Sequence, residues 1–349
     1  MSSQTQTAST PPATPSIGWG NRVRGAGRGL ARVGGLLLAV LAIMALFAVL
    51  SDGRFLVVGN LLGMLRYMST VAILGFGLCI VLVVGEIDLS FANLYGLSGI
   101  LVAVAWIVWG WPVYLAILLA FGVAVLVGCF NAFFTAVVKI PSFIATLGSS
   151  TLLFGFTLLI SRSQSFNPTY PPPGTAVDPG QLAFFQGLSN RALPFGLPMQ
   201  VLWMAAAALV FGFLLARSLF GFRLKAIGGN QRAAELARLP VTRYKFLAFV
   251  LMALAACLAA LLDFAFIGSI QPTAGQQLLF PSFAAVIIGG ASLAGGRGTI
   301  TGTLSGALLL AVIANGLALL AAGSFVQQMF LGTVTIAAVV LDQVTQRLK

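Results

Sequence analysis

The feature that most constrains this chain is a series of apolar segments, most of them about 20 residues long, separated by short polar stretches. A segment of this length crosses a bilayer as a helix, because lipid offers no hydrogen-bond partner to an open backbone. Charged residues make up only 7% of the chain, whereas soluble domains carry about 25%. No alternation typical of a membrane barrel strand is seen. We therefore predict an all-α polytopic membrane protein.

We predict ten membrane-spanning helices that form a single domain over residues 33–345, behind a disordered basic tail over residues 1–32. The eighth apolar segment is short enough to be a broken or re-entrant helix. The predicted spans are 33–50, 63–84, 91–109, 112–130, 142–160, 200–217, 246–267, 282–294, 299–320 and 325–341.

The basic residues predict the orientation, because cytoplasmic loops are enriched in Lys and Arg. With a cytoplasmic N-terminus, ten spans return the C-terminus to the cytoplasm. All but four of the nineteen basic residues then lie inside, the exceptions being Arg54, Arg66, Arg162 and Arg191. The net charge of +12 follows from this asymmetry and does not indicate a nucleic-acid partner. A topology shifted by one missed span is the alternative.

Two predicted loops are long. Residues 162–199 lie outside and are rich in proline, which suits either an external docking surface or a plain tether. Residues 218–245 lie inside and are basic. Within them, residues 231–238 are predicted to form a short helix that follows a break at Gly228 and Gly229 and precedes Pro240. A surface helix this short has little apolar area of its own to hold it in place. We therefore expect it to pack on a partner.

The chain lacks the residues of several catalytic classes. It has no His, which excludes His-based metal sites and triads, and it has no GxxxxGK[ST] phosphate loop. The glycine-rich residues 295–299 lack that spacing and its Lys. We therefore expect neither a bound metal or cofactor nor catalysis by this chain. Gly298, Gly302 and Gly306 recur every four residues and predict a small face for close helix packing.

Four ordered blocks resemble a known family. GEIDLS at 85–90 is similar to the family's GGIDLS, with Glu86 at a position where Gly is common. Residues 131–148 include KIPSFIATLG, close to KLPPFIVTLG, and AIGGN at 226–230, followed by two alanines, is similar to AVGGNxxAA. QPTAG at 271–275 precedes IGGASLAGGRGT at 288–299, which resembles VIGGTSLSGGRGT. The blocks resemble permease subunits of bacterial ABC importers for ribose, xylose, arabinose and galactose, which are related to branched-chain amino-acid permeases.

The resemblance implies a type II-like ABC importer permease fold in the bacterial inner membrane, with a homodimer of this chain as the expected assembly. It implies an ATP-binding subunit, which would hold ATP and Mg²⁺, and a periplasmic binding protein that delivers a monosaccharide. The 218–245 loop would dock on the ATPase. The coupling residues implied by the third block and the helix after it are Gly228, Gly229, Asn230, Ala233, Ala234, Glu235 and Arg238. The same machinery for another small solute, or a stand-alone secondary transporter, is the alternative.

Several polar residues in or beside the spans are candidates for the translocation pathway. Glu86 and Asp88 adjoin two spans, where carboxylates are unfavourable unless they have a role. Each either lines the pathway and contacts the solute or braces the turn, and Asp88 would brace it at the start of the next helix, where the helix dipole favours an anion. Asp263, late in the seventh span, either pairs with a polar residue or faces a cavity. The remaining candidates either line the pathway or bond between helices; they are Asn93, Asn131, Thr146, Asn315 and Gln328.

Overall fold

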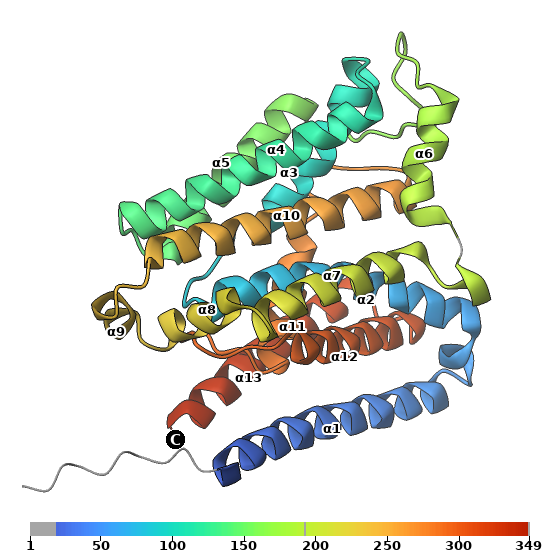
Figure 1. The fold of residues 1–349 in the computed structure, drawn as a ribbon. Coiled ribbons are helices and arrows are strands. Elements are labelled where there is room, and N and C mark those ends of the chain that lie inside the picture. The colour runs from blue at the N-terminus through green and yellow to red at the C-terminus, as the bar shows by residue number, and fades with distance from the viewer. Residues whose placement is uncertain (1–18, 192, 348–349) are drawn as a thin grey trace, which may run out of the picture.

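The structure is a computed structural model that describes residues 19–191 and 193–347, and the described residues form helices with no strand (Figure 1). The first helices are α1 (Trp19–Leu50), α2 (Val58–Val83), α3 (Phe91–Ala103), α4 (Val113–Ala132), α5 (Ser142–Ser161), α6 (Pro179–Asn190) and α7 (Met199–Ala216). They are followed by α8 (Leu219–Gly229), α9 (Gln231–Leu236), α10 (Val241–Ile267), α11 (Leu279–Ile288), α12 (Ile300–Leu319) and α13 (Ser324–Arg347). The π-helical segments η2 (Val104–Val108) and η3 (Phe133–Val137) continue α3 and α4. Short 3₁₀ turns η1 (Arg54–Leu56), η4 (Pro194–Gly196) and η5 (Gln276–Leu278) lie between helices.

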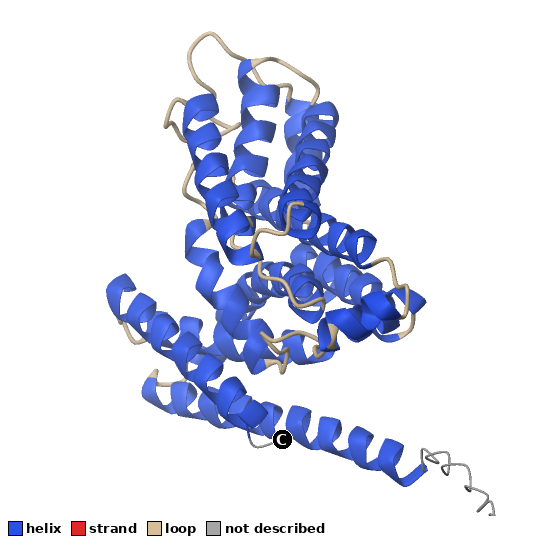
Figure 2. Cartoon of the chain, turned by 90° about the vertical axis from the view of Figure 1, so that its left-hand side faces the viewer, coloured by secondary structure: helices blue, strands red, loops and turns tan. Residues whose placement is uncertain are grey.

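The long helices run side by side, with α2, α3 and α10 in the interior (Figures 1 and 2). The most apolar stretches of α2 and α3 are 89% buried, whereas only 28% of those of α4, α5 and α7 is buried and the rest is half-buried or exposed. Leu209 of α7 and Leu118 of α4 are exposed although both are large and apolar. An apolar surface of this kind suits lipid rather than water.

The all-α prediction is confirmed, and the described helices that are long and apolar enough to cross a membrane number seven. They are Val58–Val83, Phe91–Val108, Val113–Val137, Ser142–Ser161, Met199–Ala216, Val241–Ile267 and Ile300–Leu319. The first, eighth and tenth predicted spans correspond to shorter apolar segments, Leu37–Leu50, Gln276–Ile288 and Phe325–Ala337. The eighth ends at Ile288 rather than at residue 294, because two glycines follow it and Gly290 has a left-handed φ of 98°.

Three segments predicted to lie outside the spans differ from the structure. Residues 19–32, which were predicted to belong to the tail, form the first part of α1, because no proline lies between Pro15 and the end of this helix to interrupt it. Residues 1–18 lie outside the described residues. The 162–199 segment contains α6, which starts with Asp178 as its cap and Pro179 in its first turn. In the 218–245 segment, α8 continues through both glycines, and the break falls at Asn230, whose side chain caps α9.

The turns gather at two opposite ends of the helices (Figure 1). We call them the α9 end, with residues 84–90, 138–141, 217–240 and 289–299, and the α6 end, with residues 51–57, 109–112, 162–198 and 268–275. Basic side chains at or next to the α9 end are Lys139, Arg217, Arg223, Lys225, Arg232, Arg238, Arg243, Lys245 and Arg297. Of the described basic side chains, only those of Arg54, Arg66, Arg162 and Arg191 lie toward the α6 end.

The small face of α12 meets other helices closely. A Cβ on Gly302 would collide with the Gly289 carbonyl oxygen, and one on Gly306 would collide with that of Ala285, both in or next to α11. A Cβ on Gly298 would lie 2.9 Å from the Cys79 sulfur of α2. These three glycines therefore let α12 and the segment before it approach α11 and α2.

Candidate functional site

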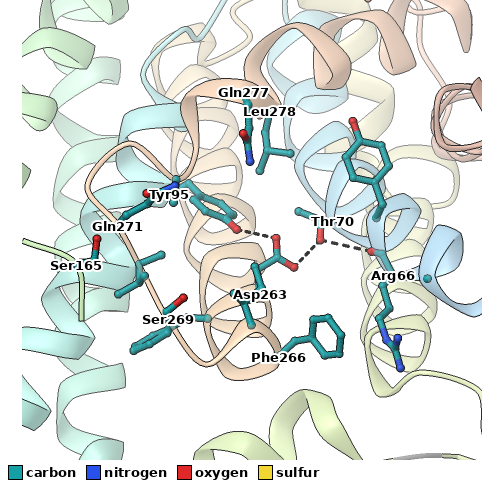
Figure 3. Close-up of a pocket in the computed structure, with 16 residues that line it drawn as sticks. Arg66, Thr70, Tyr95, Ser165, Asp263, Phe266, Ser269, Gln271, Gln277 and Leu278 are labelled. Carbon is teal, nitrogen blue, oxygen red and sulfur yellow. Dashed lines mark hydrogen bonds between the residues drawn. The ribbon is translucent and has the colours of Figure 1, made fainter. Parts of the chain in front are cut away.

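A cavity of about 640 Å³, lined by both polar and apolar side chains, lies between α2, α3, α10 and the 268–278 segment, near the α6 end (Figure 3). Its polar lining comes from segments far apart in the sequence. The polar and charged lining residues are Arg66, Tyr67, Thr70, Tyr95, Ser165, Asp263, Ser269, Gln271 and Gln277. We call this space the Asp263 cavity.

Asp263 brings three interior helices together. Its carboxylate on α10 accepts a hydrogen bond from the Tyr95 hydroxyl of α3 at 2.6 Å and one from Thr70 Oγ1 of α2 at 2.7 Å (Figure 3). A carboxylate has about four acceptor sites, so acceptor capacity is left beyond the two bonds shown. The structure therefore places Asp263 both in a polar pair and beside a cavity, which are the two roles that the sequence left open.

A second charged group borders the cavity. The Arg66 guanidinium stacks over the Phe266 ring, with Cζ 4.5 Å from the ring centroid. Such a cation–π contact is compatible with further hydrogen bonds in the guanidinium plane. The buried Arg66 Nε has no hydrogen-bond partner among the described residues. The cavity thus combines a carboxylate, a guanidinium, hydroxyls, amides and an aromatic ring, a set that can bind a small polar solute.

A smaller cavity of about 340 Å³ adjoins the Asp263 cavity, and the two share Gly63, Tyr67, Gln277 and Leu278. Asn315 and Gln328, both predicted pathway residues, line the smaller one. The amide of Asn315 also exchanges hydrogen bonds of 2.8 and 2.9 Å with that of Asn60. The pair joins α12 to α2, so Asn315 bonds between helices and also lines this cavity.

The other predicted polar residues bond to neighbouring elements. Asn93 Nδ2 donates to Ser150 Oγ at 2.9 Å, which links α3 to α5. Thr146 Oγ1 accepts from the Leu89 amide at 3.1 Å, which ties α5 to the turn at 85–90. Asn131 Nδ2 of α4 donates to Ser90 Oγ at 2.7 Å. Asn93, Thr146 and Asn131 therefore hold the helices around that turn.

Asp88 braces the turn before α3. Its Oδ1 accepts from the Ser90 amide at 2.7 Å and from the Ser90 hydroxyl at 2.6 Å, and its side chain is buried. Burial raises the pKa of Asp88 to about 6, and the hydrogen bonds from Ser90 and from the Phe91 amide act in the opposite direction. The dense bonding around Asp88 indicates a structural brace.

We expect Asp88→Ala to destabilise the protein by about 1–3 kcal/mol, because it leaves the buried Ser90 amide and hydroxyl without their acceptor. Asp88→Asn keeps an acceptor oxygen and should destabilise less. Thermal unfolding of the detergent-purified protein measures both. Equal unfolding temperatures for wild type and Asp88→Ala would show that the brace is dispensable.

The predicted coupling residues lie in and around α8 and α9. Asn230 accepts from the Ala233 amide at 2.9 Å and so caps α9, while Ala234 is buried. Arg238 follows α9 with a left-handed φ of 57°. A Cβ on Gly228 would collide with the Val83 carbonyl oxygen of α2. The remaining three, Gly229, Ala233 and Glu235, are exposed.

At the α9 end, Glu86 pairs with Lys245 across 2.5 Å, beside a cavity of about 980 Å³. Sequence reasoning assigned no role to Lys245, Thr70, Tyr95 or Arg66. The signal available for Arg66 was a charge inside an apolar span. Thr70 and Tyr95 carry no such signal, because hydroxyl groups are common in spans and their shared partner is remote in sequence.

Comparison with known proteins assigns the family. A family model described as branched-chain amino acid transport system / permease component matches residues 60–339. The ribose import permease protein RbsC of Bacillus subtilis is 35% identical over 303 residues, covering 87% of this chain and 90% of its own length. The xylose transport system permease protein XylH of Escherichia coli is 29% identical over 360 residues, covering 89% and 92%. These matches confirm the resemblance drawn from the four sequence blocks, and the chain belongs to the branched-chain amino acid transport system permease component family.

Proposed function

We propose that this chain is the transmembrane subunit of an ATP-driven ABC importer that moves a monosaccharide, a pentose or hexose, across the bacterial inner membrane. The relatives named for ribose and xylose import support this class of solute. The observation that carries the proposal is the Asp263 cavity, which offers hydroxyl, amide and charged partners next to an aromatic ring. Sugar hydroxyls are both donors and acceptors, so this mixed lining suits them.

In the proposed orientation the α9 end faces the cytoplasm, because most of the described basic side chains lie there. Both termini would then be cytoplasmic, and the three shorter apolar segments would complete a bundle of about ten membrane-inserted helices. The Asp263 cavity would open toward the periplasm. A periplasmic binding protein would deliver the solute to this face.

The ATPase partner would dock at α8 and α9. Leu219, Phe222 and Leu236 there are 73%, 73% and 81% exposed, an unusual exposure for large apolar side chains at a basic membrane boundary. ATP and Mg²⁺ would be held by that partner, so this chain acts as a transport subunit rather than an enzyme. A second copy of the chain, also embedded in the bilayer, would complete the permease.

A branched-chain amino acid is the second candidate solute. The family description names this class, and Asp263 and Arg66 supply opposite charges that match an ammonium and a carboxylate group. A nucleoside or a sugar-like signal is a further variant of the same machinery. A stand-alone secondary transporter predicts instead uptake that is independent of an ATPase.

A pull-down of the tagged chain from its native membrane, followed by mass spectrometry, tests the assembly. We expect an ATP-binding subunit and a periplasmic binding protein to be recovered. The recovered complex, reconstituted in liposomes, should take up ribose or xylose only with ATP. Uptake of leucine in preference to either sugar would favour the second solute class. Uptake driven by an ion gradient without ATP would refute the importer.

A further inference from the structure

One ion pair is recorded among the described residues, and it is buried. Lys245 Nζ lies 2.5 Å from Glu86 Oε1, and the two residues are 6% and 8% exposed. Replacing a buried ion pair with neutral groups of similar size is often neutral or even stabilising. Such a pair is therefore weak evidence for a contribution to stability, and its position suggests another role.

The pair joins the turn at 85–90 to the first turns of α10. Glu86 follows α2, whereas Lys245 is the fifth residue of α10. Both residues border the cavity of about 980 Å³ at the α9 end. A relative movement of α10 and the turn would therefore have to move this pair or separate it.

A chain of polar side chains leads from the ion pair to α9. Lys245 Nζ also donates to Gln231 Oε1 at 3.0 Å, and Gln231 Nε2 donates to Glu235 Oε1 at 2.8 Å. Gln231 is the first residue of α9. A lysine ammonium has three donors, so Lys245 can hold Gln231 and Glu86 together. We call Glu235, Gln231, Lys245 and Glu86 the polar chain.

The turn that receives this contact is bonded to two further helices. The Ile87 amide donates to Ser142 Oγ at 3.0 Å and the Leu89 amide to Thr146 Oγ1 at 3.1 Å, both on α5. Asp88 fixes the start of α3 through Ser90. A displacement of Glu86 would consequently act on α3 and α5 together.

We propose that Lys245 and Glu86 are positioning residues that transmit a displacement of α9 to the 85–90 turn, so that the docked ATPase controls the α9 ends of α2, α3 and α5. The inference rests on the proposed function. It predicts that cutting the polar chain separates ATP hydrolysis from transport without unfolding the permease. A purely structural pair predicts that both activities and the amount of folded protein fall together.

Gln231→Ala is the sharpest test, because Gln231 is exposed and the ion pair itself stays intact. Surface substitutions of this kind usually change stability little. In the liposome-reconstituted complex, we expect the solute imported per ATP hydrolysed to fall about tenfold, within the range of typical coupling between sites. The unfolding temperature should stay at the wild-type value. Thr242→Ala, an exposed change that also borders the cavity, serves as the control and should leave the ratio unchanged.

The ion pair is tested by three variants. Lys245→Met and Glu86→Gln each leave one buried charge unpaired, and each should lower the yield of folded protein. The double variant removes both charges and should fold, yet remain uncoupled like Gln231→Ala. Lys139 borders the same cavity but forms no ion pair in the described part of the chain. Lys139→Met is therefore the control, and its complex should keep ATP hydrolysis coupled to transport.

The outcomes separate the inference from the proposed function. A wild-type complex without ATP-dependent uptake would overturn the proposed function. If the wild-type complex, the double variant and Gln231→Ala all import the same amount of solute per ATP hydrolysed, only the inference is overturned. Parallel loss of uptake, ATPase activity and folded protein in every variant would assign the polar chain to stability alone.

Discussion

Asp263→Ala is expected to lower kcat/KM for ATP-dependent solute uptake by about 10- to 100-fold, as for the loss of hydrogen bonds to a charged group worth about 1.5–3 kcal/mol. The substitution removes the carboxylate that borders the Asp263 cavity, and it leaves the Tyr95 and Thr70 hydroxyls without their shared acceptor. Initial uptake rates over a range of solute concentrations, measured with the reconstituted complex, give the effect on kcat and KM.

Conservative variants separate solute contact from helix support. Tyr95→Phe and Thr70→Val each remove one hydroxyl bonded to Asp263 but leave the carboxylate beside the cavity. If the carboxylate contacts the solute, each should lower uptake less than Asp263→Ala does. Equal losses from all three would assign Asp263 to interhelical packing. Wild-type uptake by a correctly inserted Asp263→Ala protein would remove the cavity from the pathway altogether.

Much of the helical architecture could be predicted, because the rule behind it is local. A stretch of about 20 apolar residues must form a helix in lipid whatever surrounds it. That rule found the segments that became α2, α4 and α10. A different local rule failed at the start of α6, where the prolines of the 162–199 segment were interpreted as keeping the chain extended. The local signal was present there, since Asp178 caps the helix and Pro179 occupies its first turn.

The candidate site could be predicted only in part, because its geometry joins residues far apart in the sequence. Asp263 was noticeable as a carboxylate within a span. Its partners Tyr95 and Thr70 lie 168 and 193 residues away, and nothing in one sequence pairs them with it. Glu86 was noticed for the same reason as Asp263. Lys245 was counted only as a basic loop residue, although it is buried in α10 against that glutamate.

Substitution by Leu is expected to prevent folding at Gly228 but not at Gly229, the two adjacent glycines of the third sequence block. Gly228→Leu should prevent accumulation of folded protein, because a side chain there would collide with the Val83 carbonyl oxygen and a Cβ would lie 2.7 Å from the Gly296 amide nitrogen. Overpacking against side chains typically destabilises a protein by about 1–3 kcal/mol. The atoms contacted here belong to the backbone, which can move away less readily than a side chain can. Val83, Gly228 and Gly296 belong to three segments, so the collision separates α2, α8 and the turn before α12.

Gly229→Leu is the matched control, since no atom lies within 4 Å of a Cβ built at this position. The protein should fold, and its unfolding temperature in detergent should match the wild type. Should α8 and α9 form the ATPase-docking surface, the added side chain would still lower uptake by hindering that contact. Size-exclusion profiles and thermal unfolding of both variants measure the contrast. Similar profiles for the two would contradict the close packing of Gly228, whereas normal uptake by Gly229→Leu would place the docking surface elsewhere.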